Sequence, residues 1–100
     1  MITILEDQDF DELISNDLVL VDFYADWCGP CQMLGPILEE LNNINIIKVD
    51  IDKFDELTHS YGVMSVPTLI FFKNGAEIRK EIGYHSKEEL ETIIKTLKEE

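Results

Sequence analysis

Basic side chains are scarce in this chain of 100 residues. Eight lysines and arginines stand against 21 aspartates and glutamates, and the formal net charge at pH 7 is −13. Because nucleic acids and anionic membranes attract basic surfaces, the composition argues against both as partners. The excess of acid favours solubility and partners that present basic surfaces.

Long hydrophobic runs and a basic amino-terminal segment are also missing. The longest apolar runs, such as Leu18 to Val21, fall far below the roughly 18 residues that a membrane helix needs. The chain start has no basic residue and turns acidic at Glu6, unlike a signal or transit peptide. We therefore expect a cytoplasmic protein with no membrane partner.

Only two cysteines are present, Cys28 and Cys31, within the sequence Trp-Cys-Gly-Pro-Cys at 27–31. A bridge that closes so short a loop contributes only about 2 kcal/mol to stability. Because the bridge stabilises the fold so little, it can be reduced and re-formed without unfolding the protein, as a redox site requires. In a reducing compartment such a pair favours catalysis or metal binding.

Metal ligation by the two cysteines is the alternative to redox chemistry. Zinc or an iron–sulfur cluster would need two further soft ligands. The two histidines, His59 and His85, do not have the spacing of a zinc finger. We therefore expect no metal and no bound cofactor.

Hydrophobic spacing and turn residues predict strands alternating with helices, without repeats or linkers. The first half of the chain should contain a strand over 2–5, a short helix capped by Asp7 or Asp9, a strand over 18–25, and a helix over 31–42 that is kinked at Pro36. A strand over 44–52 and a short helix over 54–61, ended by Gly62, should follow. The chain should end with a hairpin of strands 68–72 and 77–82 around Asn74-Gly75 and a helix that begins with a capping box of Ser86 and Glu89.

Two of these segments carry more specific expectations. The run 18–25 is nearly all apolar, as in a central strand covered on both faces, and the cysteines follow its carboxyl end. Sites in open α/β sheets lie at such carboxyl ends. The run 76–82 alternates, with Ala76, Ile78 and Ile82 on one face and charged residues on the other, as on a half-exposed strand.

The whole chain resembles the thioredoxin family. The most specific matches are Val21 to Cys31, the stretches Tyr61 to Val63 and Val66 to Thr68, and Phe72 to Gly75. The resemblance implies an α/β thioredoxin fold in one domain over residues 1–100. Its central mixed five-stranded β-sheet would be flanked by four α-helices.

The resemblance also implies the roles of the central residues. Cys28 would be the attacking thiol and Cys31 the resolving thiol, with Asp22 as proton acceptor for Cys31 and Lys48 as the partner of that acid. Burial should raise the pKa of Asp22 toward the working range. Two alternatives stay open: Asp22 as a carboxylate held by a structural partner, and Lys48 as a solvated surface lysine.

The two thiols are expected to differ in reactivity. Only Cys28 should be exposed, at the start of a helix whose dipole stabilises a thiolate. Gly29 and Pro30 add no charge that would stabilise the thiolate further, which favours a reductant over an oxidant.

A docking surface is implied around the cysteines. The Val66–Pro67 peptide bond should be cis, with the backbone of Val66 pairing with an extended substrate segment. The apolar frame of this surface would be formed by Trp27, Gly29, Pro30, Gly83 and Tyr84. Core packing is the alternative for Trp27.

The chain departs from the family pattern at three places. Gln32 stands where a lysine or arginine usually follows the second cysteine, Tyr84 stands where a small residue is common, and the connection between the active-site helix and the third strand is short. These differences should affect partner choice more than chemistry.

The predicted function is that of a monomeric protein disulfide reductase with a reversible Cys28–Cys31 disulfide. The resemblance implies thioredoxin reductase as electron donor and peroxiredoxin- or reductase-type enzymes as disulfide substrates. The alternative is a binding module or folding-aid subunit with the same fold that does not depend on its thiols.

Overall fold

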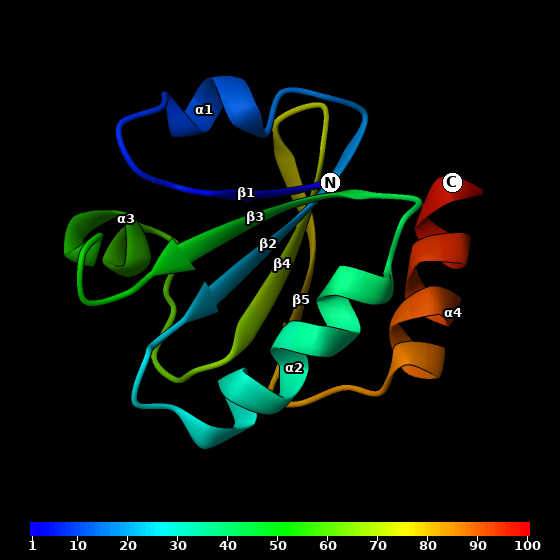
Figure 1. The fold of residues 1–100 in the computed structure, drawn as a ribbon. Helices are drawn as coiled ribbons and strands as arrows, with labels where there is room; N and C mark the ends of the chain where they lie inside the picture. The colour runs from blue at the N-terminus through cyan, green and yellow to red at the C-terminus, as the bar shows by residue number, and fades with distance from the viewer.

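The computed structural model describes residues 1–100 and contains one mixed five-stranded sheet with four helices (Figure 1). The elements are β1 (Ile2–Ile4), α1 (Phe10–Leu13), β2 (Leu18–Tyr24), α2 (Gly29–Glu40), β3 (Asn45–Asp50), α3 (Asp55–Ser60), β4 (Thr68–Lys73), β5 (Ala76–Ile82) and α4 (Lys87–Lys98). The strand order is β1-β3-β2-β4-β5, in which β1, β3 and β2 are parallel and β4 and β5 antiparallel to their neighbours. This arrangement confirms the expected fold class.

The sheet separates two hydrophobic cores, with α2 and α4 on one face and α1 and α3 on the other (Figure 1). Alternate residues of β2 supply both cores, because successive side chains of a strand point to opposite faces. Leu18 and Leu20 pack toward α2 and α4, whereas Val19, Val21 and Phe23 pack toward α1 and α3. The expectation of a central strand covered on both faces is confirmed.

The active-site helix α2 begins two residues earlier than the spacing of its leucines predicts. Cys28 has extended backbone angles and is the N-cap, so Gly29 and Pro30 form the first turn. A proline is accommodated there because the first backbone N–H groups of a helix have no partner within it. The helix then continues through Pro36 to Glu40.

The hairpin turn and the last helix follow the prediction. Asn74 and Gly75 have positive φ angles of 53° and 86°, as both central residues of a type I′ turn require. Ser86 and Glu89 form the capping box of α4 with reciprocal hydrogen bonds.

The expected arrangement of β5 is wrong. Its apolar face is not covered: Ile82 is 66% exposed and Ile78 38%, whereas Arg79 and Glu81 are only partly exposed. A bulge explains part of the difference, because Phe71 pairs with Arg79 and Phe72 with Glu77, which leaves Ile78 without a partner.

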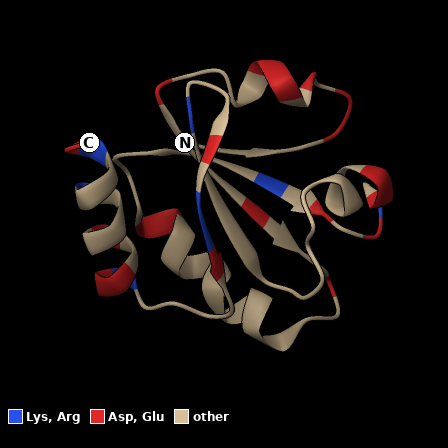
Figure 2. Cartoon of the chain, turned by 180° about the vertical axis from the view of Figure 1, so that it is seen from behind, with Lys and Arg blue, Asp and Glu red and all other residues tan.

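The distribution of charged residues reflects the acidic composition of the chain. Acidic residues recur along the helices and loops, whereas basic residues are few (Figure 2). No helix has the length and apolar character needed to span a membrane.

Candidate active site

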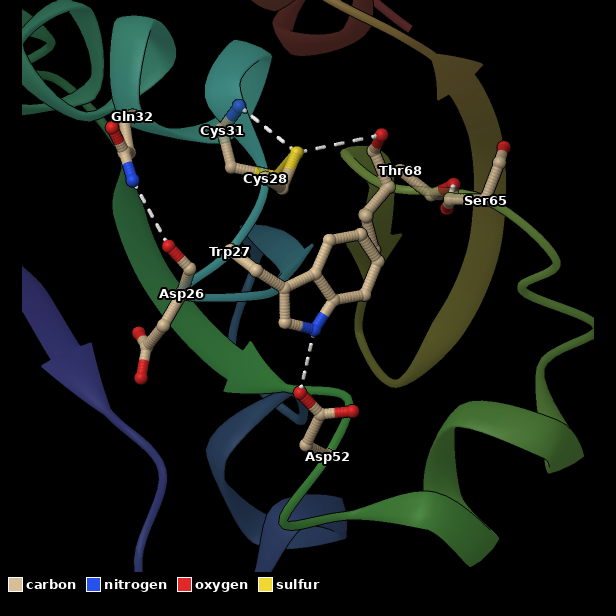
Figure 3. The surroundings of a disulfide bond; sticks show 9 residues. Asp26, Trp27, Cys28, Cys31, Gln32, Asp52, Ser65 and Thr68 are labelled. Carbon is tan, nitrogen blue, oxygen red and sulfur yellow. Dashed lines mark hydrogen bonds between the residues drawn. A yellow bond between two sulfur atoms is a disulfide. The ribbon is translucent and has the colours of Figure 1, made fainter.

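The two cysteines form a disulfide at the point where β2 leads into α2. Cys28 lies at the N-cap, and its sulfur accepts a hydrogen bond from the backbone N–H of Cys31 at 3.2 Å (Figure 3). The free N–H groups and the dipole of a helix N-terminus favour negative charge. The site is therefore built to stabilise a thiolate on Cys28.

Burial does not distinguish the two cysteine residues of the disulfide, contrary to the expectation that only Cys28 is exposed. Cys28 is 4% exposed and Cys31 6%. Cys28 is covered because its sulfur lies 3.7 Å from the carbonyl oxygen of Val66 and packs with Ala25. A difference in reactivity between the two thiols would therefore have to come from their positions relative to the helix terminus.

The loop that covers Cys28 contains the cis peptide bond between Val66 and Pro67. The Thr68 hydroxyl donates to the carbonyl oxygen of Ser65 at 2.7 Å and closes this loop. The backbone N–H of Gly83 donates to the carbonyl oxygen of Pro67 at 2.9 Å, and Gly83 has a positive φ of 92°. The second of these bonds attaches the loop to the residue that follows β5.

The indole of Trp27 lies on the surface beside the disulfide. It is 69% exposed, which rules out the alternative of core packing. Its Nε1 donates to Oδ2 of Asp52 at 2.9 Å (Figure 3). Sequence reasoning missed Asp52, although its place just after β3, at the carboxyl edge of the sheet, was a usable signal.

A cleft of about 480 Å³ extends from Trp27 toward α3. It is bounded by Val63, Met64 and Val66 from the loop and by Asp52 and other residues from the opposite side. Met64 is 95% exposed, and Tyr84, beyond Gly83, is 45% exposed. Exposed apolar side chains therefore occur both in the loop that contains the cis peptide bond and just after β5, and Met64 was not anticipated.

Gln32, one of the departures from the pattern that the resemblance implies, contributes a hydrogen bond at the start of α2. Its Nε2 donates to the carbonyl oxygen of Asp26 at 2.9 Å (Figure 3). The bond ties the first turn of α2 to the segment that precedes Trp27 and Cys28. The uncharged side chain of Gln32 therefore supports this turn through a hydrogen bond.

Asp22 is the buried acid of the site. It is 1% exposed, its Oδ1 has no hydrogen-bond partner, and no ion pair involves it. Burial raises the pKa of Asp22 from its ordinary value of 3.8 to about 6, and the charge of Lys48 opposes that rise. No hydrogen bond or ion pair to a structural partner holds this carboxyl group at Oδ1.

Lys48 lies opposite Asp22 on the neighbouring strand, since the two residues are partners in the parallel register of β2 and β3. It is half-buried, and its Nζ lies 4.6 Å from the centre of the Tyr24 ring. Lys48, Tyr24 and Cys31 line a cleft of about 340 Å³. Lys48 is therefore not simply a solvated surface lysine, and the ring of Tyr24 was not anticipated.

His85 makes its hydrogen bonds away from the two cysteines. His85 lies between two acceptors, the carbonyl oxygen of Gly83 and Oε1 of Glu81, each at 3.0 Å. No group of three or more His, Cys, Asp or Glu side chains is arranged to hold a metal ion.

Comparison with known proteins agrees with this geometry. A family model described as Thioredoxin matches residues 1–96. The chain is 46% identical to a thioredoxin of Chlamydia pneumoniae over 98 residues, which cover 94% of this chain and 96% of the relative. It is 42% identical to a thioredoxin of Bacillus subtilis over 93 residues, which cover 88% and 89%.

Solved structures give the same result. A mutant thioredoxin of Halobacterium salinarum superposes with a TM-score of 0.89 at 39% identity, covering 96% of this chain and 89% of that one. The oxidised thioredoxin of Plasmodium falciparum superposes with a TM-score of 0.83 at 36% identity, covering 96% and 97%. The chain therefore belongs to the thioredoxin family and is a protein-disulfide oxidoreductase whose redox centre is the pair Cys28 and Cys31.

Proposed function

We propose that this protein is a monomeric, cytoplasmic protein disulfide reductase that acts through a mixed disulfide on Cys28. The N-cap position of Cys28 supports Cys28 as the attacking thiol, because the backbone N–H of Cys31 donates a hydrogen bond to its sulfur. The cytoplasmic assignment is supported by cysteine usage, because both cysteines serve the redox pair and none is left for a structural bridge.

The reaction begins from the reduced protein. The thiolate of Cys28 attacks one sulfur of a substrate disulfide, forms a mixed disulfide, and displaces the other substrate sulfur as a thiolate, which takes up a proton. Cys31 then loses its proton to Asp22 and attacks the sulfur of Cys28. The second substrate sulfur leaves as a thiolate and takes up a proton. Two electrons have then passed to the substrate, and the protein holds the Cys28–Cys31 disulfide.

Asp22 suits the second step because it is buried and unpaired. A general base works best when its pKa lies near the working pH, and the pKa of Asp22 is raised to about 6. Its Oδ1 has no hydrogen-bond partner and is free to accept a proton. Lys48 supplies a nearby positive charge that favours the ionised acid.

The docking surface lies around the cis peptide bond. Val66 is proposed to pair its backbone with an extended substrate segment, beside Pro67. Exposed apolar groups at Trp27 and Tyr84 would then contact the segment on either side. Gly29 and Pro30, in the first turn of α2, complete this surface.

The proposed partners are thioredoxin reductase, which would restore the dithiol, and enzymes that form disulfides during turnover. One similar structure, at 34% identity, concerns thiol resolution in a yeast mitochondrial 1-Cys peroxiredoxin via glutathione and thioredoxin systems. It supports peroxiredoxin-type enzymes as a substrate class for this chain.

Turnover of a protein disulfide tests the proposal. Insulin is incubated with the purified protein and either NADPH with a thioredoxin reductase or reduced ferredoxin with its own reductase, and electron consumption is followed. We expect sustained consumption that disappears in a Cys28→Ser/Cys31→Ser double variant. If neither donor supports turnover, the reductase assignment fails. A cellular role that survives the double variant would identify a thiol-independent binding module instead.

A further inference from the structure

Three polar side chains share one face of the sheet beneath the disulfide. Asp22 and Tyr24 are two residues apart on β2, so they point to the same face. Lys48 pairs with Asp22 in the register of β2 and β3 and lies on that face as well. Cys31, on α2, lines the same cleft as Tyr24 and Lys48.

The ammonium group of Lys48 contacts the ring and not the acid. Its Nζ lies 4.6 Å from the centre of the Tyr24 ring, within the range of a cation–π interaction. No ion pair joins it to Asp22, although the two residues are directly opposite on adjacent strands. Asp22 correspondingly keeps an Oδ1 without any partner. A buried carboxylate and a nearby ammonium normally attract each other strongly, so this separation needs a cause.

We propose that Tyr24 is a positioning residue whose ring holds the Lys48 ammonium away from Asp22 and thereby keeps the buried carboxyl unpaired. A direct ion pair would occupy the free oxygen and stabilise the ionised acid, which would make it a weaker base. The catalytic importance of this separation rests on the proposed role of Asp22 as proton acceptor. The separation itself does not depend on that role.

Other charged groups near the cluster do not offer Lys48 an equivalent partner. Asp50 accepts a hydrogen bond from the backbone N–H of Asp52 through its Oδ1 at 2.9 Å. Asp26 lies in the segment after β2, at the solvent-facing rim of the cleft. The other strands present apolar residues to the pair, since Leu69 of β4 is opposite Asp22 and Ile4 of β1 is opposite Lys48.

The phenol of Tyr24 does not compete by ionising. Burial raises the pKa of Tyr24 above its ordinary value of 10.0, and the nearby acids Asp50, Asp26 and Asp22 raise it further. On α2 the facing groups are Cys31, held in the disulfide, and the uncharged Gln32. A Lys48 ammonium released from the ring would therefore be free to approach the unpartnered oxygen of Asp22.

The test follows the Asp22 carboxyl by carbon-13 NMR in the oxidised protein, where neither cysteine titrates. Tyr24→Phe keeps the ring, and we expect its titration midpoint to match that of the unchanged protein. In Tyr24→Leu the ring is lost, and the midpoint should fall by about one pH unit or more, because an opposite charge at close range lowers the pKa of an acid by about that much. An unchanged midpoint in Tyr24→Leu, or an equal fall in Tyr24→Phe, overturns the proposal.

Greater access of water to Asp22 would also lower its midpoint in Tyr24→Leu, and a second background separates the two causes. In Lys48→Met the substitution of Tyr24 should have little effect, since no ammonium is present to move. If Tyr24→Leu lowers the midpoint equally with and without Lys48, hydration is the cause and the proposal fails.

A measurement on the unchanged protein does not depend on any variant folding. The ε-methylene protons of Lys48 should show an upfield ring-current shift from Tyr24, and ordinary shifts would overturn the proposal. Because neither measurement uses activity, a failure of positioning is distinguishable from a failure of the proposed reductase function.

Discussion

Replacing Asp22 with Asn should remove the part of the pH dependence of stability that this buried acid causes between mildly acidic and neutral pH. The pKa of Asp22 is raised from 3.8 to about 6 by burial, so the folded protein holds its proton at pH values where the unfolded chain has released it. The contribution of the protonated acid to the free energy of unfolding is therefore fully present below pH 3.8 and is lost as the pH rises through about 6.

The size of this effect follows from the same two pKa values. At about 1.36 kcal/mol per pKa unit, a rise from 3.8 to about 6 corresponds to a loss of about 3 kcal/mol. For a domain of this size, about 3 kcal/mol shifts the melting temperature by more than about 10 °C. Asn cannot ionise, so the variant should lack this loss and should be the more stable protein at neutral pH.

Urea unfolding of the oxidised protein at a series of pH values measures the prediction. The quantity to compare is the change in unfolding free energy between pH 4 and pH 7, in the unchanged protein and in Asp22→Asn. This difference cancels the cost of burying the asparagine amide, which does not depend on pH. If both proteins lose stability equally over that interval, Asp22 is not a buried acid with a raised pKa.

Other predictions concern the thiols and the core. Cys31→Ser should accumulate mixed disulfides with substrates that persist on non-reducing gels, whereas Cys28→Ser should capture far less; equal trapping by both would contradict the assigned roles. Limited iodoacetamide should label Cys28 of the reduced protein before Cys31, as read by mass mapping, and the reverse order would exchange those roles. Asp22→Asn should slow resolution of the mixed disulfide more than its formation, and rapid mixing that shows unchanged resolution would reduce Asp22 to a structural residue. Leu38→Ala should cost about 2–5 kcal/mol in chemical denaturation, because Leu38 is fully buried between α2 and the sheet; a smaller loss would mean that the cavity collapses.

The sequence predicted elements whose signals are local. The continuous apolar run of β2, the Asn74-Gly75 turn and the Ser86 capping box each depend on residues close in the chain, and each is present in the structure. The edge strand β5 was misjudged, because a bulge against β4 and the placement of α4 decide which side is covered. Neither can be derived from the alternation of β5 itself.

The site likewise contains features that the sequence predicts and features that appear only in the folded structure. The Cys-Gly-Pro-Cys sequence and the buried acid are visible in the chain, and the resemblance supplied Lys48. The covering of Cys28 by the Val66 loop and the contact of Lys48 with Tyr24 arise from segments brought together only by folding. Trp27 also needed the structure, since the same residue type suits a core or a surface.

The burial of both sulfurs bears on how the oxidised protein communicates with its surroundings. A disulfide only 4% and 6% exposed offers small thiols in solution little surface to attack, and thiol–disulfide exchange depends on access as well as on reactivity. We expect the oxidised form to exchange slowly with small thiols in solution. If the proposed reductase is the electron donor, the redox state of the protein should depend on docking of that enzyme more than on the concentration of free thiols.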